Sequence, residues 1–307
     1  MTISRNQIVN LEILTEKGLN LSMKREDEIH PFISGNKYRK LKYNLINAKA
    51  KGFTKLLSYG GAFSNHISAL SYAGKVHGFK TIGVIRGDEL GVDIDQTLET
   101  NPTLKFAHDN GMKLEFISRD AYKRKNDPDQ LVKLESRHSE FYEIPEGGTN
   151  MLAIKGCEEI LTDADLEFDY ICVAVGTGGT ISGLINASSE TQSIIGFPSL
   201  KGQFLDGLIS EKVGNKMNWK LMHEYHFGGY AKINEFLIRF INDFNQQTTI
   251  PLDPIYTGKM MFGIMDLVKN DFFKKNSSIL VVHTGGLQGI EGMNKRLIKK
   301  DLPLINV

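Results

Sequence analysis

Short apolar runs alternate along the chain with longer segments of helical period. The apolar runs are rich in Val, Ile and Leu and each closes on a charge or a glycine, as strands commonly do. Because most of them are nearly continuous rather than alternating, they are typical of strands covered on both faces of a parallel sheet. They occupy residues 55–61, 80–87, 113–119, 141–148, 169–179, 193–199 and 278–286.

The segments between these runs include two amphipathic stretches, residues 68–78 and 233–247, which predict helices. Strands that alternate with helices favour an α/β architecture with right-handed crossovers. A chain of 307 residues is long enough for one large domain or two of medium size. The pattern therefore predicts an α/β fold with parallel sheets.

The composition excludes several classes of partner. The formal net charge is +1, which gives no reason to expect nucleic acid or an acidic membrane surface as partner. No apolar run approaches the ~18 residues that span a bilayer, and residues 1–18 lack the features of a signal peptide. We expect a cytoplasmic protein that binds a small molecule.

The chain has only two cysteines, Cys157 and Cys172. Two are too few for a disulfide framework or a zinc site, so we expect no metal centre. Both lie in apolar surroundings, which predicts buried free thiols.

Three predicted strands end in glycine pairs, at residues 60–61, 178–179 and 285–286. Open parallel sheets bind ligands at the carboxyl ends of their strands, and glycine lets a ligand approach the backbone closely there. One such pair is weak evidence because glycine ends many strands. Three pairs in one chain predict a cofactor site at these strand ends.

The segment "VAVGTGGTISGL", residues 173–184, is the strongest candidate for binding an anion. Backbone N–H groups, two hydroxyls and a helix N-terminus can converge on one phosphate there. The alternative is a tight turn without a ligand. The chain lacks the glycine fingerprint of a dinucleotide-binding fold, which weakens that alternative. A Walker loop is excluded because no Gly-Lys-Ser/Thr follows. The predicted phosphate ligands are Gly176, Thr177, Gly178, Gly179 and Thr180.

A phosphate loop together with a lysine on the turn "SGNK", residues 34–37, suggests pyridoxal phosphate. The chain resembles the fold-type II pyridoxal-phosphate enzymes, and within them the D-cysteine desulfhydrases and 1-aminocyclopropane-1-carboxylate (ACC) deaminases. The resemblance spans about residues 24–290. It rests on six motifs in the family's order, "KREDEIHPFISGNKYRKL", "SYGGAFSNHISAL", "IPEGGTNMLAIKG", "GTGGTISGL", "LDPIYTGKMMFGI" and "HTGG".

The resemblance implies two parallel-sheet α/β domains of the tryptophan synthase β-like class, with the cofactor between them. The larger comprises residues 1–41 and 147–307, and the smaller comprises residues 42–146. It also implies a homodimer.

The resemblance assigns Lys37 to the Schiff base with the cofactor, a role that needs an amine able to act as nucleophile and as base. Lys40 lies one helical turn further on the same face and is expected at the phosphate. For both residues the alternative is a solvated lysine. Asn65 is expected at the phenolic oxygen of the cofactor, and Ser64 at the substrate carboxylate and α-carbon.

Other expected site residues have a purely structural interpretation as well. Ser64 and Asn65 also suit a helix N-cap. His66 could equally be a core histidine or a wall of the site. Tyr256 and Tyr230 match the active-site tyrosines of the family and are expected to move a proton near the scissile bond, although such residues often only pack.

Two threonines indicate the reaction. By the resemblance, ACC deaminases carry glutamate where this chain has Thr257 and leucine where it has Thr284. Thr284, and secondarily Thr257, is therefore expected at the ring nitrogen of the cofactor, where a hydroxyl favours β-elimination. The predicted reaction converts D-cysteine to pyruvate, sulfide and ammonia.

Three alternatives to this reaction remain. They are an ACC deaminase, a non-catalytic protein that carries pyridoxal phosphate, and a nucleotide-binding dehydrogenase. Two departures from the family pattern, Ala153 in place of glycine and the apolar continuation after Asn65, leave the small amino-acid substrate open.

Overall fold

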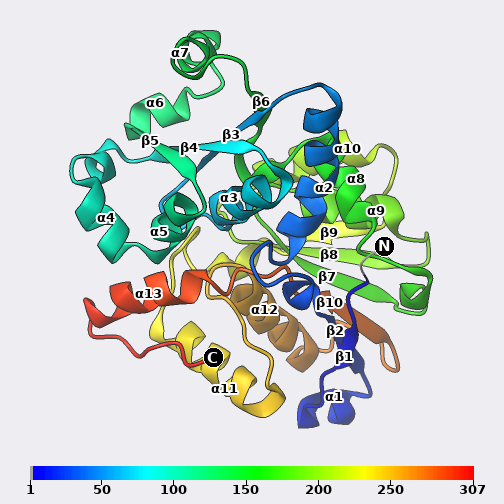
Figure 1. The fold of residues 1–307 in the computed structure, drawn as a ribbon. Coiled ribbons are helices and arrows are strands. Elements are labelled where there is room, and N and C mark those ends of the chain that lie inside the picture. Colours follow the sequence, from blue (N-terminus) through cyan, green and yellow to red (C-terminus); the bar gives the residue numbers. More distant parts are fainter. Residues whose placement is uncertain (1–2) are drawn as a thin grey trace.

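The computed structural model describes residues 3–307 and contains two β-sheets, each covered by helices (Figure 1). The strands are β1 Asn6–Ile8, β2 Asn20–Lys24, β3 Lys55–Gly60, β4 Lys80–Arg86, β5 Met112–Ile117, β6 Tyr142–Ile144, β7 Tyr170–Val175, β8 Ser193–Pro198, β9 Trp219–Leu221 and β10 Ser278–Val282.

The large sheet has the strand order β1-β2-β10-β7-β8-β9 and the small sheet has the order β5-β4-β3-β6. All neighbouring strands are parallel except β1, which runs antiparallel to β2. The carboxyl ends of the parallel strands within each sheet therefore lie along one edge, where open α/β sheets bind their ligands.

Helices lie on both sides of each sheet (Figure 1). They are α1 Glu12–Lys17, α2 Asn36–Ala50, α3 Asn65–His77, α4 Ile94–Thr100, α5 Pro102–Asp109, α6 Arg119–Lys123, α7 Pro128–His138, α8 Met151–Glu158, α9 Gly179–Ala187, α10 Phe204–Val213, α11 Glu235–Thr248, α12 Thr257–Lys269 and α13 Gly289–Ile298. Short 3₁₀ turns are η1 Glu26–Glu28, η2 Asp88–Gly91, η3 Glu146–Gly148, η4 Asp163–Asp165 and η5 His223–His226.

Strand β7 shows why its sequence is apolar throughout. Ile171 and Val173 pack into the core beneath α8, α9 and α10, whereas Cys172 and Ala174 pack into the core beneath α1, α11 and α12. Successive side chains of a strand point to opposite faces, so a strand with helices on both sides needs an apolar residue at every position. This arrangement confirms the predicted α/β class with parallel sheets.

The small sheet is covered in the same way. Leu56 of β3 packs with residues of α2, α3 and α5, and Leu57 packs with residues of α6 and α7. The predicted domain boundaries at residues 41/42 and 146/147 fall inside α2 and η3. The division into these two domains stays a prediction.

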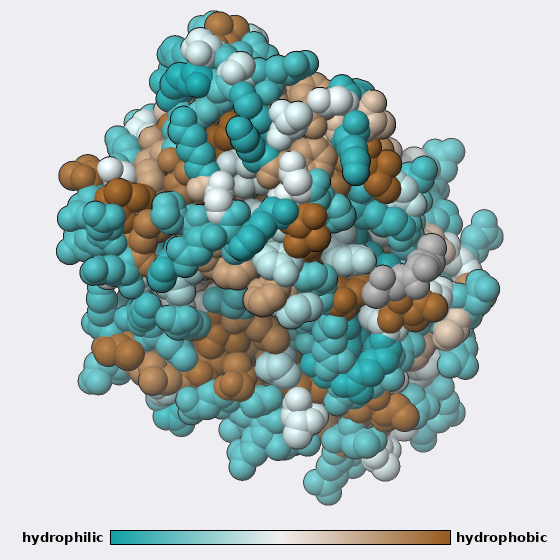
Figure 2. Space-filling view, in the orientation of Figure 1, coloured by the Kyte–Doolittle hydropathy of each residue, from teal (hydrophilic) through white to brown (hydrophobic). Residues whose placement is uncertain are grey.

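Figure 2 shows a face that is mostly hydrophilic, with hydrophobic side chains gathered in separate groups. Scattered exposed apolar side chains are ordinary for a globular protein and need no special explanation. Within residues 3–307, no helix combines the length and the apolar character that crossing a membrane requires.

Helix α2 is seated against α8 by a contact between backbones. A Cβ atom on Gly156 of α8 would lie 2.0 Å from the carbonyl oxygen of Arg39 in α2. The next helix pair repeats this arrangement, since a Cβ on Gly183 of α9 would lie 2.8 Å from the carbonyl oxygen of Ile154 in α8. Only glycine allows helices to approach so closely.

We predict that Gly156→Ala destabilises the protein by about 1–3 kcal/mol or more, because overpacking forces rigid backbone apart. Urea unfolding followed by circular dichroism measures the change. Gly207 in α10 is the matched control, since a Cβ there has no neighbour within 4 Å. Gly207→Ala should be neutral or stabilising by about 0.5–1 kcal/mol. Equal destabilisation by the two substitutions would contradict the close approach of α2 and α8.

Candidate active site

A cavity of about 320 Å³ opens between the two sheets, where the carboxyl ends of their strands meet. The loop after β3, the last residue of β4 and the loop after β6 contribute from the small sheet, and the loops after β7 and β10 contribute from the large sheet. Predicted site residues that line the cavity are Lys37, Lys40, Ser64, Asn65, Gly176, Thr177, Gly178, Thr180, Tyr230, Tyr256 and Thr284.

Lys37 lies in the first turn of α2, which begins at Asn36. The preceding Gly35 has a φ of 60°, and a Cβ on it would lie 1.9 Å from the carbonyl oxygen of Thr284. The chain can therefore enter α2 against the end of β10 only with glycine at position 35. This contact fixes the backbone of Lys37 at the base of the cavity.

The Lys37 ammonium donates a hydrogen bond to Oδ1 of Asn36 over 2.9 Å. Burial, and secondly the charge of Lys40, lower the pKa of Lys37 from 10.5 to about 7. Taking an ammonium out of water disfavours its charged form, and a like charge adds to that effect. Near neutral pH the amine is therefore neutral in a large fraction of molecules and can act as a nucleophile or a base.

Lys40 reaches the opposite side of the cavity. Its ammonium donates to the carbonyl oxygen of Gly147 at 3.1 Å, to Oγ1 of Thr149 at 2.9 Å and to Oγ1 of Thr177 at 3.4 Å. Burial lowers its pKa. Among the described residues, neither Lys40 nor Lys37 forms an ion pair with a carboxylate within 4.0 Å. The cavity thus holds two cationic groups without an anionic partner.

The glycine loop, residues 176–180, joins β7 to α9. Gly178 has a φ of 83°, and α9 begins at Gly179. Gly179 does not itself line the cavity. It lies directly behind the lining, because a Cβ there would meet Thr149 at 2.9 Å and Cε of Lys40 at 3.3 Å. The loop therefore presents backbone N–H groups and a helix N-terminus beside the Lys40 ammonium, which is a suitable site for an anion.

Ser64 and Asn65 begin α3 at the end of β3. The Ser64 hydroxyl accepts a hydrogen bond from the backbone N–H of Ile67 at 3.3 Å, so the N-cap interpretation is confirmed. Both residues also line the cavity. A helix N-terminus attracts negative charge, which makes this edge of the cavity suited to a carboxylate.

His66 is both a buried residue and a wall of the cavity. The Ser58 hydroxyl donates to the carbonyl oxygen of Ile144 at 2.7 Å, so its contact of 2.8 Å with Nε2 of His66 makes that nitrogen the donor. Nδ1 is then an acceptor, and it has no partner among the described residues. Burial, followed by the charges of Lys37 and Lys40, lowers the pKa of His66 well below its ordinary value. The ring is neutral.

Tyr256 and Tyr230 face each other on the large-sheet side of the cavity. Their rings are 6.2 Å apart at an angle of 63°, in an edge-to-face arrangement. Burial raises the pKa of both phenols, and that of Tyr256 rises well above its ordinary value. Each phenol therefore keeps its proton at neutral pH and can donate it.

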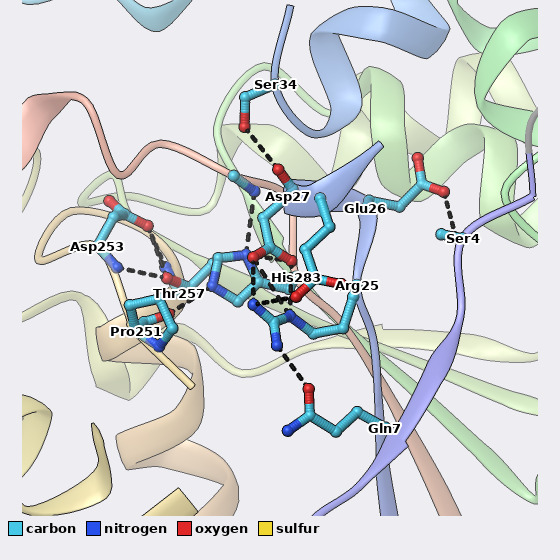
Figure 3. A network of polar contacts seen from close by, with 12 residues as sticks. Ser4, Gln7, Arg25, Glu26, Asp27, Ser34, Pro251, Asp253, Thr257 and His283 are labelled. Atoms are coloured by element: carbon cyan, nitrogen blue, oxygen red, sulfur yellow. Dashed lines mark hydrogen bonds and ion pairs between the residues drawn. The ribbon is translucent and has the colours of Figure 1, made fainter. Parts of the chain in front are cut away.

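Of the two threonines expected at the ring nitrogen, only Thr284 lines the cavity. Thr257 is fully buried, and its hydroxyl donates to Oδ1 of Asp253 at 2.8 Å and accepts from the Asp253 backbone N–H at 2.8 Å. Figure 3 shows Thr257 turned toward Asp253. The structure thus corrects the prediction for Thr257, because its hydrogen-bonding capacity is used at the start of α12.

A polar network surrounds His283, the residue that precedes Thr284 (Figure 3). The His283 Nε2 donates to the carbonyl oxygen of Pro251 at 2.7 Å, and Nδ1 accepts from the Gly285 N–H at 3.2 Å. The Asp27 carboxylate lies 3.5 Å from Nδ1 of His283 and accepts hydrogen bonds from Nε and Nη2 of Arg25. The network joins the ends of β2 and β10 and holds the Thr284 backbone in place.

Pyridoxal phosphate fits these residues. The two ammonium groups offer positive charge to a phosphate, and the glycine loop leaves room that Cβ atoms would fill. The pair Gly285 and Gly286 repeats this feature at the end of β10, where a Cβ on Gly286 would lie 2.9 Å from Nδ2 of Asn65.

Sequence reasoning missed several lining residues. Asn36 joins the site together, because its amide nitrogen donates to Oγ1 of Thr180 at 2.8 Å while its oxygen accepts from Lys37. Arg86 and Glu146 line the cavity from the small sheet. Arg86 could have been found as a charge at the carboxyl end of a predicted strand, whereas the role of Asn36 depends on contacts far apart in the sequence.

The comparisons with known proteins indicate the same cofactor. A family model described as pyridoxal-phosphate dependent enzyme matches residues 1–285. A putative ACC deaminase of Pyrococcus horikoshii is 31% identical over 297 residues, covering 90% of this chain and 87% of the relative.

Two further similarities extend over most of the chain. A mitochondrial bifunctional D-cysteine desulfhydrase/ACC deaminase of Arabidopsis thaliana is 29% identical, covering 89% of this chain and 74% of the relative. The crystal structure of an ACC deaminase homologue superposes with a TM-score of 0.81 at 30% identity, covering 97% of this chain and 93% of the homologue.

We predict that the Lys37 amine of the cofactor-free protein reacts with an aldehyde about tenfold faster at pH 8 than at pH 6. Only the neutral amine reacts, and the neutral fraction increases as the pH rises past the pKa of the amine. The pKa of about 7 places this rise near neutrality. The measurement uses pyridoxal, which lacks the ionising phosphate, with borohydride trapping and peptide mass spectrometry at each pH. Lys40→Met should move the rise to higher pH, since a repelling charge is removed. A shift to lower pH would contradict the assigned cause.

Proposed function

Because the chain belongs to the family of pyridoxal-phosphate dependent enzymes, we propose that it is a lyase for a small amino acid with a leaving group on its β-carbon. The preferred substrate is D-cysteine, which with one water gives pyruvate, sulfide and ammonia. The observation that carries the proposal is the partly buried Lys37 amine, with its pKa near 7, in one cavity with the glycine loop and two phenols.

In this proposal the glycine loop and Lys40 would hold the cofactor phosphate, and Thr284 and Asn65 would lie beside its ring. When bound, the cofactor would supply an acceptor for the electron pair that remains when a proton leaves the α-carbon of the substrate. The rest of the reaction depends on how the side chains of this chain bind the substrate and move its protons.

Lys37 Nζ takes the proton from the α-carbon. Its depressed pKa keeps the amine unprotonated in a large fraction of molecules near neutral pH, which a base requires. The first turn of α2 holds its backbone in place, so only the flexible side chain has to move. The N-terminus of α3, with Ser64 at its N-cap, binds the substrate carboxylate and turns the α-hydrogen toward Lys37.

The phenol of Tyr256 donates a proton to the leaving sulfur. Burial raises the pKa of that phenol, so it stays protonated and can donate its hydrogen to the sulfur as negative charge develops there. Tyr230 lies against Tyr256 and closes the cavity on the same side.

An ACC deaminase is the second candidate, and the names of the Pyrococcus and Arabidopsis relatives favour it. Thr284 supports the elimination instead. A ring nitrogen that meets a hydroxyl would stay largely neutral, and the ring would then withdraw electrons less strongly than a ring whose nitrogen a carboxylate keeps protonated. Thr257 no longer contributes to this argument, since its hydroxyl is held by Asp253.

We propose in addition that the protein is a cytoplasmic homodimer that does not bind nucleic acid. The resemblance to the family supports the homodimer, and the net charge of +1 supports the absence of a nucleic-acid partner. Light scattering of the purified protein tests the oligomeric state.

We expect the protein to release pyruvate and sulfide from D-cysteine and to release little 2-oxobutanoate from ACC. Pyruvate and 2-oxobutanoate are both measured with lactate dehydrogenase and NADH, and sulfide is measured separately. Thr284→Leu should lower the elimination rate, whereas the hydroxyl-preserving Thr284→Ser should retain it. Efficient release of 2-oxobutanoate without release of sulfide would establish the deaminase. Binding of the cofactor without release of either product would establish a non-catalytic protein.

We expect Tyr256→Phe to lower kcat for D-cysteine by about 10²-fold, the usual order for loss of a positioned proton donor. The same variant should lose less than about fivefold with β-chloro-D-alanine, because chloride leaves without a proton. The comparison of the two substrates in one variant removes general effects on folding. Equal losses with both substrates would show that Tyr256 does not protonate the leaving group.

A further inference from the structure

Tyr230 is carried by a segment of unusual backbone, residues 226–231, called here the Tyr230 loop. Four of its residues have positive φ, namely Phe227 at 53°, Gly228 at 89°, Gly229 at 114° and Ala231 at 54°. The left-handed region is unfavourable for phenylalanine and alanine, so surrounding contacts must hold this conformation. Tyr230 itself is 41% exposed, so its ring alone does not anchor the loop.

One face of α12 supplies those contacts. Residues 259, 262, 263 and 266 follow the spacing that places side chains on one side of a helix. Phe262 packs edge-on against Phe227 at 5.0 Å, and the Tyr225 hydroxyl donates to Oδ2 of Asp266 at 2.8 Å. A Cβ on Gly263 would lie 2.8 Å from the Tyr225 ring. The segment that leads into the Tyr230 loop is therefore pressed against α12.

Lys259 is the cationic member of this face, and it is only 1% exposed. Its ammonium donates to the carbonyl oxygen of His226 at 2.9 Å and to that of Gly229 at 2.8 Å. These two carbonyls stand at the first and fourth positions of the loop, and the second one directly precedes Tyr230. A single side chain thus binds the Tyr230 loop to α12 at two points, residues 226 and 229.

The two carbonyl oxygens have other partners within the loop. His226 O also accepts from the Gly229 N–H at 3.0 Å, and Gly229 O accepts from the Lys232 N–H at 3.1 Å. Without Lys259 the loop keeps these bonds within itself but loses its polar attachment to α12. The loop could then retain its shape and still shift relative to the cavity.

Helix α12 also begins beside the other active-site phenol, Tyr256. The N–H groups of Tyr256 and Thr257 both donate to the Asp253 carboxylate, at 3.0 and 2.8 Å. Lys259 therefore joins the Tyr230 loop to the same helical turn whose position Asp253 fixes. This connection determines how the two phenols lie relative to each other.

We propose that Lys259 is a positioning residue, which sets the Tyr230 hydroxyl over the cavity by binding the carbonyl oxygens of His226 and Gly229. Displacement of a reacting group by about 1 Å can lower a rate by 10²-fold, even when the change is far from the chemistry. Loss of these two bonds should therefore reduce turnover rather than substrate binding.

The attachment does not depend on the charge of Lys259. Burial lowers its pKa from 10.5 to about 8, and the nearby Asp253 carboxylate opposes this shift. A neutral amine still carries two hydrogens, enough for the two carbonyl oxygens. The Tyr230 loop therefore stays attached on both sides of pH 8.

The first test follows the loop directly. Lys259→Met keeps most of the unbranched side chain and removes its N–H donors, so amide hydrogen exchange of residues 226–232 should accelerate about tenfold or more. The peptide that covers residues 257–269 should exchange as before. The matched control is Lys216→Met, which removes a lysine-to-carbonyl bond of 2.9 Å to Ser188, away from the cavity. It should leave residues 226–232 unchanged.

The second test is a double-mutant cycle on kcat and KM, and it rests on the proposed function. Lys259→Met should lower kcat for D-cysteine about 10²-fold with KM changed less than threefold, and Lys259→Gln, which retains a donor, should lose less. In the Tyr230→Phe background the same Lys259→Met substitution should cost less than about threefold, because the hydroxyl that it positions is already absent.

Equal losses in the two backgrounds, or unchanged exchange of residues 226–232, would overturn the proposal. If Lys259→Met does not fold, the exchange and the cycle are measured on Lys259→Gln, with the same criteria. A parent protein that turns over no substrate would refute the proposed function, while the exchange measurement would still decide whether Lys259 holds the loop.

Discussion

The site depends on one contact between two stretches of backbone, Gly35 against Thr284. The missing side chain of Gly35 lets the start of α2 touch the end of β10 in the large sheet. The same helix then packs Leu41 and Leu45 into the core of the small sheet. One helix therefore belongs to both halves of the structure, and its first turn, which carries Lys37, lies where the two sheets meet. Any side chain at position 35 would separate the lysine from the strand ends.

That contact places two lysines where water cannot solvate them well. Isolated cations are costly to bury, so the structure supplies carbonyl, hydroxyl and amide oxygens instead of a carboxylate. The result is a cavity with unbalanced positive charge and an amine of reduced basicity. A carboxylate partner would have stabilised the empty protein, yet it would also have raised the pKa of Lys37 and repelled a phosphate. The buried carboxylate whose charge acts on Lys37, Asp253, is occupied by four hydrogen bonds from residues 255–257.

The sequence predicted the parts of the fold that local pattern determines. The strands β3 to β8 and β10 and the helices α3 and α11 were all expected, whereas β1, β2 and β9 were not. Of these three, β1 and β9 are edge strands of three residues, which form only because a neighbouring strand is already in place. Within the site, the motifs located the lining residues, but Thr257 was misplaced. The spacing of four residues between Asp253 and Thr257 could have indicated that the two side chains bind each other at the start of a helix. The roles of Asn36 and Lys259 arise from contacts between distant segments.

The two cysteines described above give the protein a chemical property of its own. Both are fully buried, and burial raises the pKa of Cys157 to about 11 and that of Cys172 further still. Thiolates are the reactive form of cysteine, so neither sulfur reacts readily in the folded state. The proposed reaction would release sulfide, and oxidants and persulfides derived from it modify exposed thiols. The folded protein offers them no such thiol, and the appearance of two titratable thiols therefore reports the loss of its core.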